Sequence, residues 1–303
     1  MIEIRLAQKG EIAPQKEIWK LCFADSAEYI NLFYDYRYEE GETLLLLQDG
    51  NIVSMLTMRP VTLVNSSGAG VSSVMLYALA THPKFRHKGL MTQLMDFCHQ
   101  ALAEQGIFYA ILVPEGLKLA NFYRKFGYRH AFFVREAKLS ASSLVKLPGG
   151  HSVHGWISAA SPQEYNRRRN ELLEGITYIS YPEEEIAYQK KLSQLLKADI
   201  YAIDILMGKK EIQGCATVER LSERRVLIRE ILLTEEHIGW AIKQLAQHFP
   251  AEEYIIRTPV EAGKYLGGTV KPLGMLKVIT DAKRQNNAVL SSESSGYLGL
   301  AFD

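Results

Sequence analysis

The 303-residue chain is predicted to adopt an α/β fold in which a mixed sheet and its helices are divided between two domains. Three observations support this prediction. The length is sufficient for about two domains, each with a sizeable hydrophobic core. Hydrophobic residues make up 47% of the chain and charged residues 23%, as in soluble globular proteins. Residues 74–113 read as strand, loop, helix and strand, which is a βαβ unit.

The composition excludes several classes of function. The net charge is +1 and the basic residues form no block, so we expect no nucleic-acid partner. The three cysteines, Cys22, Cys98 and Cys215, are widely spaced, which suits packing in a reducing compartment better than disulfides or a metal site. Met1 to Pro14 lacks the apolar core of a signal peptide, and no apolar run reaches the ~20 residues that span a bilayer. We therefore expect a cytoplasmic protein without a membrane partner, and a homo-oligomer is compatible with the sequence.

The N-terminal region begins with a predicted strand, Ile2–Leu6, and continues with two helices, Ile12–Phe23 and Ala27–Tyr38. The second helix is dense in aromatic residues with scattered acids. This pattern is typical of an amphipathic helix whose aromatic side chains pack in a core.

A β-hairpin follows, with strands at Thr43–Gln48 and Asn51–Val64 and the turn signal Asp49-Gly50 between them. The next turn, Asn65–Gly70, contains a Gly-x-Gly sequence. Because it precedes a strand and not a helix, we interpret it as a hairpin turn and not as a nucleotide-binding loop.

The central stretch begins with Val74–Ala80, an apolar run with the length of a strand that is buried on both faces. A short polar loop, His82–Lys88, leads to Gly89. From there apolar residues recur at helical spacing as far as Leu102, and Gly106 occupies the place of a helix C-cap. A second apolar run, Ile107–Val113, completes the βαβ unit.

The loop before this helix has the features of an anion site. Backbone N–H groups in the first turn of a helix lack intrahelical acceptors, and the helix dipole makes that end positive. A diphosphate fits there if the backbone can approach closely, which Gly89 permits, and Arg86 and Lys88 add positive charge. The alternative is an ordinary turn with solvated basic residues. The spacing matches neither a Walker A loop nor a Rossmann loop, so ATP and NAD are poor candidates.

Two motifs in this stretch resemble those of the GCN5-related N-acetyltransferases, the GNAT superfamily. The family signature Arg/Gln-x-x-Gly-x-Gly/Ala is matched by residues 86–91, and a later Tyr before a Gly-aromatic pair is matched by residues 121–128, Asn-Phe-Tyr-Arg-Lys-Phe-Gly-Tyr. Met91 departs from the pattern, since a small residue is usual there. In this the chain resembles the Eis-like branch, which tolerates a bulkier residue and carries a second GNAT-like domain.

The resemblance implies an acetyl-CoA-dependent enzyme that transfers an acetyl group directly to a primary amine in a ternary complex. It gives Tyr123 the role of the general acid that protonates the leaving thiolate, and it places the thioester carbonyl at the backbone around Leu79. Asn121 is expected at the pantetheine arm. The other coenzyme-binding positions that the resemblance implies are Ala80, Thr81, Arg86, His87, Lys88, Gly89, Leu90, Met91 and Thr92.

In this family the early helices usually lie over the acceptor side. The resemblance therefore gives the second helix an alternative role, in which its aromatic and acidic side chains line a pocket for a cationic amine. The residues concerned are Tyr29, Tyr34, Asp35, Tyr36 and Glu39.

The second half of the chain repeats the order of the first weakly. A strand at Ala131–Leu139 closes the first domain (residues 1–140), and a Ser-, Gly- and Pro-rich linker (residues 141–155) leads to the second (residues 156–303). His151 and His154 in the linker have a metal-like spacing but no further ligand nearby, so we expect no metal site. The elements predicted next are helices at Ser161–Leu173 and Pro182–Leu196, strands at Ile200–Met207, Ile212–Glu219 and Val226–Leu233, a helix at Glu235–Phe249 and a strand at Tyr254–Pro259.

Where the first domain has its basic Gly-containing loop, the second has only Thr234-Glu235-Glu236. An acidic helix start repels phosphate. We therefore interpret the second half as a degenerate GNAT-like domain that does not bind coenzyme. An unrelated α+β domain is the alternative, because the repeat is weak.

The sequence ends on apolar residues, Tyr297–Phe302, followed by Asp303. Chain ends are normally polar and frayed, so an apolar one is expected to be docked, most simply as a last strand. The resemblance to Eis-like proteins, in which the terminal carboxylate is the base, implies that this segment docks toward the active site and that Asp303 supplies the base. A packed strand without a catalytic role is the alternative.

Two other functions are compatible with the motifs. One is transfer of a different acyl or aminoacyl group on the same scaffold, because a fold does not fix the acyl group or the acceptor. The other is a catalytically silent acyl-CoA-binding or regulatory protein. Tyr123 argues against the silent protein, whereas Met91 favours it.

Overall fold

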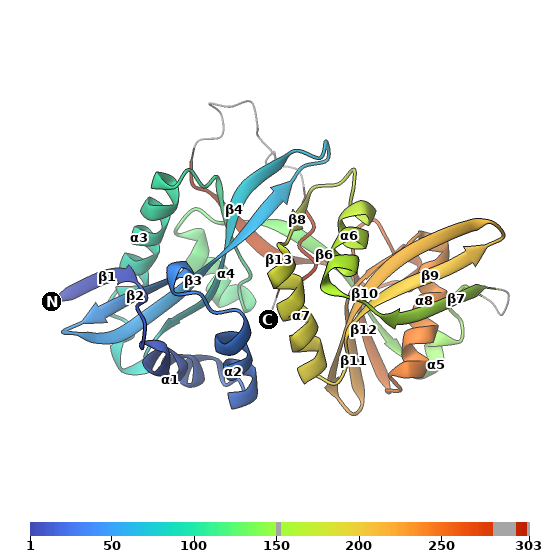
Figure 1. Ribbon diagram of the computed structural model, residues 1–303, viewed down its shortest axis with the longest axis horizontal. Helices are drawn as coiled ribbons and strands as arrows, with labels where there is room; N and C mark the ends of the chain where they lie inside the picture. The colour runs from blue at the N-terminus through green and yellow to red at the C-terminus, as the bar shows by residue number, and fades with distance from the viewer. Residues whose placement is uncertain (150–152, 281–294, 302–303) are drawn as a thin grey trace. The chain divides into compact units, whose positions relative to one another are not determined.

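The computed structural model describes residues 1–149, 153–280 and 295–301 (Figure 1). Contacts divide the chain into two compact units. The first comprises Met1–Leu63, Gly70–Arg129 and Gly274–Val289, and the second comprises Val64–Ala69, His130–Leu273 and Leu290–Asp303.

The first unit contains a mixed sheet in the order β1-β2-β3-β4-β5-β13. The pairs β1/β2, β2/β3 and β5/β13 are antiparallel, and β4/β5 is parallel. Helix α3 packs against β2 and β4, and α1 packs against β4 and α2. The elements are β1 (Ile2–Leu6), α1 (Ile12–Phe23), α2 (Ala27–Tyr36), η1 (Glu40–Glu42), β2 (Thr43–Gln48), β3 (Asn51–Val64), β4 (Gly70–Thr81), η2 (Pro83–Phe85), α3 (Leu90–Glu104), β5 (Tyr109–Leu112), α4 (Gly116–Arg124) and residues 275–278 of β13 (Thr269–Val278).

Local sequence signals explain the ends of these elements. The β2–β3 hairpin turns at Asp49 and Gly50, both of which have positive φ, as the Asp-Gly signal predicts. Helix α2 begins after Ser26, whose side chain accepts a hydrogen bond from the amide of Tyr29 at 3.2 Å. One apolar cluster then joins α3 and α4 to the sheet, so these helices are held firmly above the strands that carry the site.

The second unit has the strand order β6-β12-β11-β10-β9-β7, with β11 and β12 parallel and the other pairs antiparallel. Helices α6 and α7 pack against β9 and β10, whereas α8 packs against β7 and α5. The elements are β6 (Arg129–Ser140), α5 (Ala141–Leu144), β7 (His154–Ala159), α6 (Pro162–Leu172), β8 (Tyr178–Ser180), α7 (Glu183–Leu195), β9 (Ile200–Met207), β10 (Lys210–Ser222), β11 (Arg225–Leu232), α8 (Glu235–His248), β12 (Glu253–Thr258) and η3 (Lys264–Leu266).

The units differ from the predicted domains in three places. Strand β6, expected to close the first domain, pairs with β12 and belongs to the second unit. Residues 275–278, for which no strand was predicted, pair with β5 of the first unit. The expected linker contains α5 and the first residues of β7, so His154 is a strand residue and not a loop residue. His151 lies outside the described residues.

The apolar C-terminal segment is buried, as predicted. Gly296 and Tyr297 form isolated parallel bridges with Phe132 and Tyr178, and residues 296–301 are all buried. Asp303 lies outside the described residues.

Candidate functional site

The site predicted in the first unit lies where β4 and β5 stop pairing. Their parallel register covers only Ser73–Met75 of β4 and Tyr109–Ile111 of β5, and β5 ends at Leu112. Strand β4 continues to Thr81, so its last part has no β5 partner on that side. Leu79, predicted at the thioester, lies on this part of β4 together with Ala80 and Thr81, which were predicted to contact the coenzyme. A ligand can take the place of the missing strand there.

Ala78 breaks the regular conformation of β4 beside Leu79. Its φ of 51° lies in the left-handed region, which is uncommon for a residue other than glycine and costs free energy unless the surroundings impose it. Such an irregularity changes the direction of the backbone groups that follow, as β-bulges do near active sites. At the predicted oxyanion position the strand therefore lacks a β5 partner and departs from the regular strand conformation.

The loop between β4 and α3 presents the start of a helix to this open end. His87 and Gly89 have φ values of 64° and 74°, and α3 begins at Leu90. The first helical hydrogen bond runs from the amide of Gln93 to the carbonyl of Gly89 at 3.1 Å, and no side chain caps this end. The amides of residues 90–92 therefore have no intrahelical acceptor and are available to an anion.

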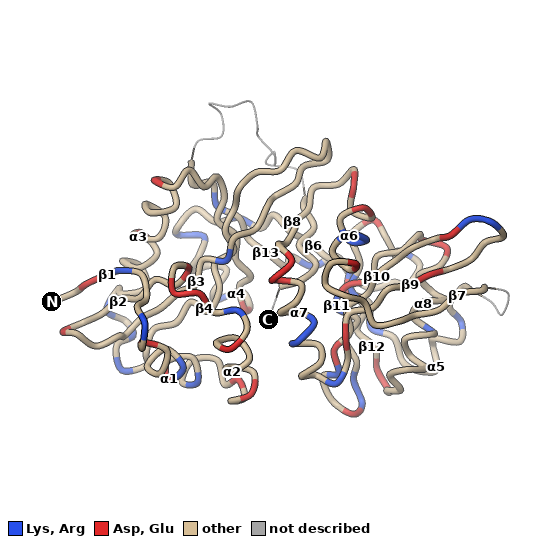
Figure 2. The backbone as a smooth tube through the Cα atoms, in the orientation of Figure 1, with Lys and Arg blue, Asp and Glu red and all other residues tan. Residues whose placement is uncertain are grey.

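The basic residues Arg86, His87 and Lys88 of this loop differ in what they contact. Arg86 donates from Nε to the carbonyl of Thr81 at 3.1 Å and from a terminal nitrogen to Sγ of Cys22 at 3.3 Å, so its side chain is tied to the end of β4. Lys88 lies over the ring of Phe85, 5.0 Å from Nζ to the ring centre, and is exposed. His87 is exposed as well. Basic and acidic residues are otherwise interspersed in each unit (Figure 2).

Tyr123 lies near the end of α4 in the same apolar cluster against which Leu79 and Met91 pack. It is 6% exposed, and its ring makes edge contacts with Phe122 and Tyr128 at centre distances of 5.4 and 6.0 Å. No described residue forms a hydrogen bond with its hydroxyl group. Burial raises the pKa of Tyr123 to about 12, so the hydroxyl keeps its proton at neutral pH. A protonated hydroxyl without a partner is the state that a proton donor requires.

The sequence did not predict the buried histidine His99, which contacts a neighbour of Tyr123. His99 Nε2 lies 2.9 Å from the hydroxyl of Tyr128, whose ring packs against that of Tyr123. Burial and the nearby charge of Lys277 lower the pKa of His99 to about 4, so the ring is neutral at physiological pH. The Lys277 ammonium donates to the carbonyl of Phe126 at 2.5 Å. No sequence signal would have revealed this arrangement, because Lys277 comes from β13, more than 170 positions after α3.

Asn121, expected at the pantetheine arm, is exposed on α4 and accepts a hydrogen bond from Arg124 at 2.7 Å. Its contact with coenzyme stays a prediction.

The aromatic residues of α2 divide into two groups. Tyr34 is buried and packs against Trp19 and Tyr38, as the amphipathic interpretation predicts, and burial raises its pKa. The hydroxyl of Tyr29 lies 3.3 Å from that of Tyr77 on the unpaired part of β4, so this side chain does reach the site.

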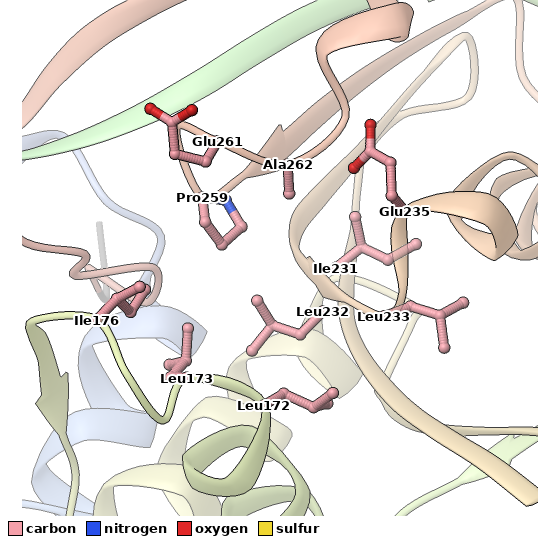
Figure 3. A pocket seen from close by; sticks show the side chains of 10 residues that line it. All are labelled: Leu172, Leu173, Ile176, Ile231, Leu232, Leu233, Glu235, Pro259, Glu261 and Ala262. Atoms are coloured by element: carbon pink, nitrogen blue, oxygen red, sulfur yellow. The ribbon is translucent and has the colours of Figure 1, made fainter. Parts of the chain in front are cut away.

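In the second unit the parallel pair β11 and β12 corresponds to β4 and β5 of the first unit, and a pocket lies at its end (Figure 3). Its volume is about 310 Å³ and its walls are mostly aliphatic. Helix α8 begins there with two acidic residues, and the Glu235 carboxylate accepts a hydrogen bond from the amide of Gly263 at 2.8 Å. The first two residues of α8 are thus acidic, and their negative charge disfavours a phosphate at this helix start. The lining residues are Leu172, Leu173, Ile176, Ile231, Leu232, Leu233, Glu235, Pro259, Glu261 and Ala262.

Comparison with known proteins identifies the first unit. A family model described as an acetyltransferase (GNAT) domain matches residues 3–131. Residues 3–131 therefore form a GNAT acetyltransferase domain. The family match covers the loop before α3, the unpaired end of β4 and Tyr123, which are the parts of the GNAT domain described above. No curated protein matches the sequence.

Solved structures show that the fold extends over both units. A probable N-acyltransferase from Enterococcus faecalis V583 is similar over 92% of this chain and 73% of its own, with 17% identity and a TM-score of 0.70. Eis1 from Mycobacterium abscessus is similar over 92% and 74%, with 13% identity and a TM-score of 0.66. A tandem GNAT protein from the clavulanic acid biosynthesis pathway is similar over 93% and 99%, with 11% identity and a TM-score of 0.57. The fold is therefore that of Eis-like tandem GNAT proteins.

Two further features of the described residues bear on cofactors and location. Within residues 1–149, 153–280 and 295–301, no group of three or more His, Cys, Asp or Glu side chains is placed to hold a metal ion. Among the same residues, no helix is long and apolar enough to cross a membrane.

Proposed function

We propose that this GNAT protein transfers an acetyl group from acetyl-CoA to a primary amine, directly and within a ternary complex. The observation that carries the proposal is the uncapped start of α3 beside the unpaired end of β4. An anion-binding helix end and an open strand edge are what a coenzyme with a diphosphate and an amide-containing arm requires.

In the proposed complex the diphosphate lies against the amides of residues 90–92. Gly89 lets the backbone approach, and the exposed side chain of Lys88 adds charge at the rim. The pantetheine arm runs along the unpaired residues 79–81, with Asn121 as a further contact. A backbone amide near Leu79 then stabilises the negative charge that develops on the thioester oxygen.

Tyr123 is proposed as the general acid that protonates the departing thiolate. An ordinary thiol has a pKa of about 8.5, so a tyrosine with a pKa of about 12 looks mismatched as its donor. The difference between the two pKa values is smaller in a site that excludes water, because burial destabilises a thiolate as well as a phenolate. Cys98 in the same unit is an example of this effect, since burial raises the pKa of its thiol to about 12 as well. In the proposed complex the thiolate formed beside Tyr123 is buried in the same way and takes the proton of the tyrosine.

The amine must lose a proton before or during attack, and Asp303 is proposed as the base. This residue lies outside the described residues, so the proposal depends on the resemblance to Eis-like proteins. Appending a few Gly and Ser residues after Asp303 tests it. Activity should fall steeply while the melting temperature stays nearly constant, and full activity in the folded, extended protein would remove Asp303 from the mechanism.

One experiment tests the function as a whole. The protein is titrated with acetyl-CoA in a calorimeter, and thiol release is then followed over a panel of primary amines, with product masses recorded. Binding with amine-dependent thiol release and a mass gain of one acetyl group is the expected result. Binding without turnover would favour a silent acyl-CoA-binding protein, and a faster reaction with another acyl-CoA would favour a different acyl group.

We also propose a cytoplasmic location, as expected from the cysteines. Cys22, Cys98 and Cys215 are all free thiols.

A further inference from the structure

The open strand end described for β4 has a counterpart in the second unit. The parallel pairing of β11 with β12 covers only Arg225–Ile228 and Glu253–Ile256, although β11 continues to Leu232. At Arg229 the pairing of β11 with β10 skips one residue, as in a β-bulge. Strand β11 therefore lacks a β12 partner after Ile228, while its pairing with β10 continues to Leu232.

A pocket lies at this open end. Its volume of about 310 Å³ is at the lower end of the ~300–1,000 Å³ range of small-molecule sites. Its walls come from the end of α6 and the residues after it, the end of β11, the start of α8 and the loop after β12 (Figure 3). Eight of the ten lining residues are aliphatic, with proline counted, and the other two are Glu235 and Glu261. Ile231 is 0% exposed and Ile176 is 39% exposed, so the apolar wall extends from the core to the surface.

The two carboxylates lie on the side of the pocket away from Leu172 (Figure 3). Glu235 accepts a hydrogen bond from the amide of Gly263 at 2.8 Å, and a carboxylate has about four acceptor sites. Glu261 forms an ion pair with Lys264 at 2.5 Å. Because the side chain of Glu261 is 80% exposed, this pair contributes little and a cationic ligand can compete for it. Both carboxylates can therefore accept a further donor.

The charges around the pocket favour a cation. The dipole of α8 contributes about half a positive charge at the helix start, where Glu235 and Glu236 contribute two full negative charges. Lys264 and Arg135 contact the loop after β12, but neither lines the pocket. Lys264 forms the ion pair described above, and Arg135 donates to the carbonyl of Val260 at 3.0 and 3.1 Å. The charged side chains that line the pocket are thus both acidic, which disfavours an anionic ligand.

We propose that this pocket binds a small primary amine with an aliphatic body, in its ammonium form. The aliphatic body lies against the leucine and isoleucine side chains, which removes apolar surface from water on both partners. The ammonium group lies at the side that holds Glu235 and Glu261 and donates charge-assisted hydrogen bonds to them. All ten lining residues belong to the second unit, and the proposal does not depend on the function proposed for the first unit.

Nuclear magnetic resonance of the full-length protein with isotope-labelled isoleucine methyl groups tests the proposal, because Ile176 and Ile231 line the pocket. Hexylamine is the probe, and its ammonium group, like that of lysine, has a pKa of about 10.4 and is charged at pH 7. Hexanol and hexanoate are its neutral and anionic counterparts. We expect hexylamine to shift both methyl signals with a single Kd, on the order of 1 mM for a ligand of this size. Hexanol should bind about 3- to 5-fold more weakly, which is the contribution of an exposed ion pair, and hexanoate more weakly still.

Two glutamine variants test the part of the carboxylate. Glu235→Gln removes the charge but keeps an acceptor for the amide of Gly263. Glu236→Gln is the matched control, because it removes the same charge from the next position of α8, which does not line the pocket. In Glu235→Gln the Kd of hexylamine should rise about 3- to 5-fold relative to Glu236→Gln, while the Kd of hexanol stays the same.

A third variant, Ala262→Phe, tests the place of the aliphatic body. The side chain of Ala262 lies in the wall of the pocket (Figure 3), so a phenyl ring there takes up space that the ligand needs. In this variant the two isoleucine signals should no longer respond to hexylamine, and thermal unfolding checks that the protein is folded. An unchanged response in the folded variant would place the amine elsewhere.

The other outcomes each overturn one part of the proposal. If ~10 mM hexylamine leaves the signals of Ile176 and Ile231 unshifted, the pocket is not an amine site. If hexanol or hexanoate binds as tightly as hexylamine, the ligand class is wrong. If the two glutamine variants bind hexylamine equally, Glu235 does not contact the ammonium group.

Discussion

Replacing Gly89 with valine tests the coenzyme loop. Gly89 precedes α3 with a φ of 74°, and a Cβ built there meets no described atom within 4 Å. That open space is where the diphosphate is proposed to approach the amides of residues 90–92. Gly106, just beyond the other end of α3, has a φ of 72° and the same open surroundings, so Gly106→Val is a matched control.

The two substitutions should cost similar stability but differ in coenzyme affinity. A residue other than glycine in the left-handed region costs about 1–2 kcal/mol, and a β-branched one up to about 3 kcal/mol, so both variants should lose about that much free energy of unfolding. Only Gly89→Val places carbon atoms before the helix start. Hydrogen bonds to charged groups contribute about 1.5–3 kcal/mol each. Losing two of them raises the Kd at least about 100-fold.

Calorimetric titration with coenzyme A and with pantetheine, which lacks the diphosphate, is the assay. Gly89→Val should lose affinity for coenzyme A and keep its weak affinity for pantetheine, while Gly106→Val should bind both like the wild type. Denaturant unfolding checks that the two variants are equally folded. If Gly89→Val binds coenzyme A as tightly as Gly106→Val, the diphosphate does not lie at this loop.

Three further predictions follow from the buried side chains of the first unit. Tyr123→Phe should lower kcat about 10²–10⁴-fold with an unchanged Kd for acetyl-CoA, and wild-type turnover in steady-state assays would make Tyr123 a packing residue. Because burial raises the pKa of Tyr123 to about 12, its hydroxyl stays protonated in alkaline solution, and loss of this proton should not lower kcat between pH 8 and about pH 10.5. A fall in kcat near pH 9 that is absent in Tyr123→Phe would contradict this prediction. The pKa of His99 is about 4 when folded and ordinarily 6.5, so the unfolded chain binds the extra proton and stability is lost as pH falls from about 6.5 to about 4. Denaturant unfolding should show a loss of about 3 kcal/mol in the wild type that is smaller in His99→Gln, and equal losses would refute the buried neutral histidine.

Local signals predicted most of the elements of the first unit. The strands Thr43–Gln48 and Asn51–Val64 and the helix Ile12–Phe23 have the predicted bounds, because a turn signal or a clear period marks each end. The loop before α3 and Tyr123 could be singled out because the residues of each motif are close in sequence, and the family match bears out the resemblance that these motifs suggested. The roles of the individual residues stay predictions.

Features that depend on distant residues were not predictable. The return of residues 275–278 to pair with β5 has no local signal, since a short apolar run does not reveal its partner. The pairing of β6 with β12, which places β6 in the second unit and not in the first, could not be predicted for the same reason. The raised pKa of Tyr123 and the buried hydrogen bond from Arg169 to the carbonyl of Leu298 both depend on burial. A single sequence does not show which side chains are buried.

The measurement that tests the central claim most directly is a crystal structure of the protein with acetyl-CoA bound. The account predicts one coenzyme per chain, with its diphosphate against the amides of residues 90–92, its thioester carbonyl at the backbone near Leu79 and its sulfur beside the Tyr123 hydroxyl. A coenzyme bound at the start of α8 in the second unit, or one whose sulfur lies away from Tyr123, would contradict it.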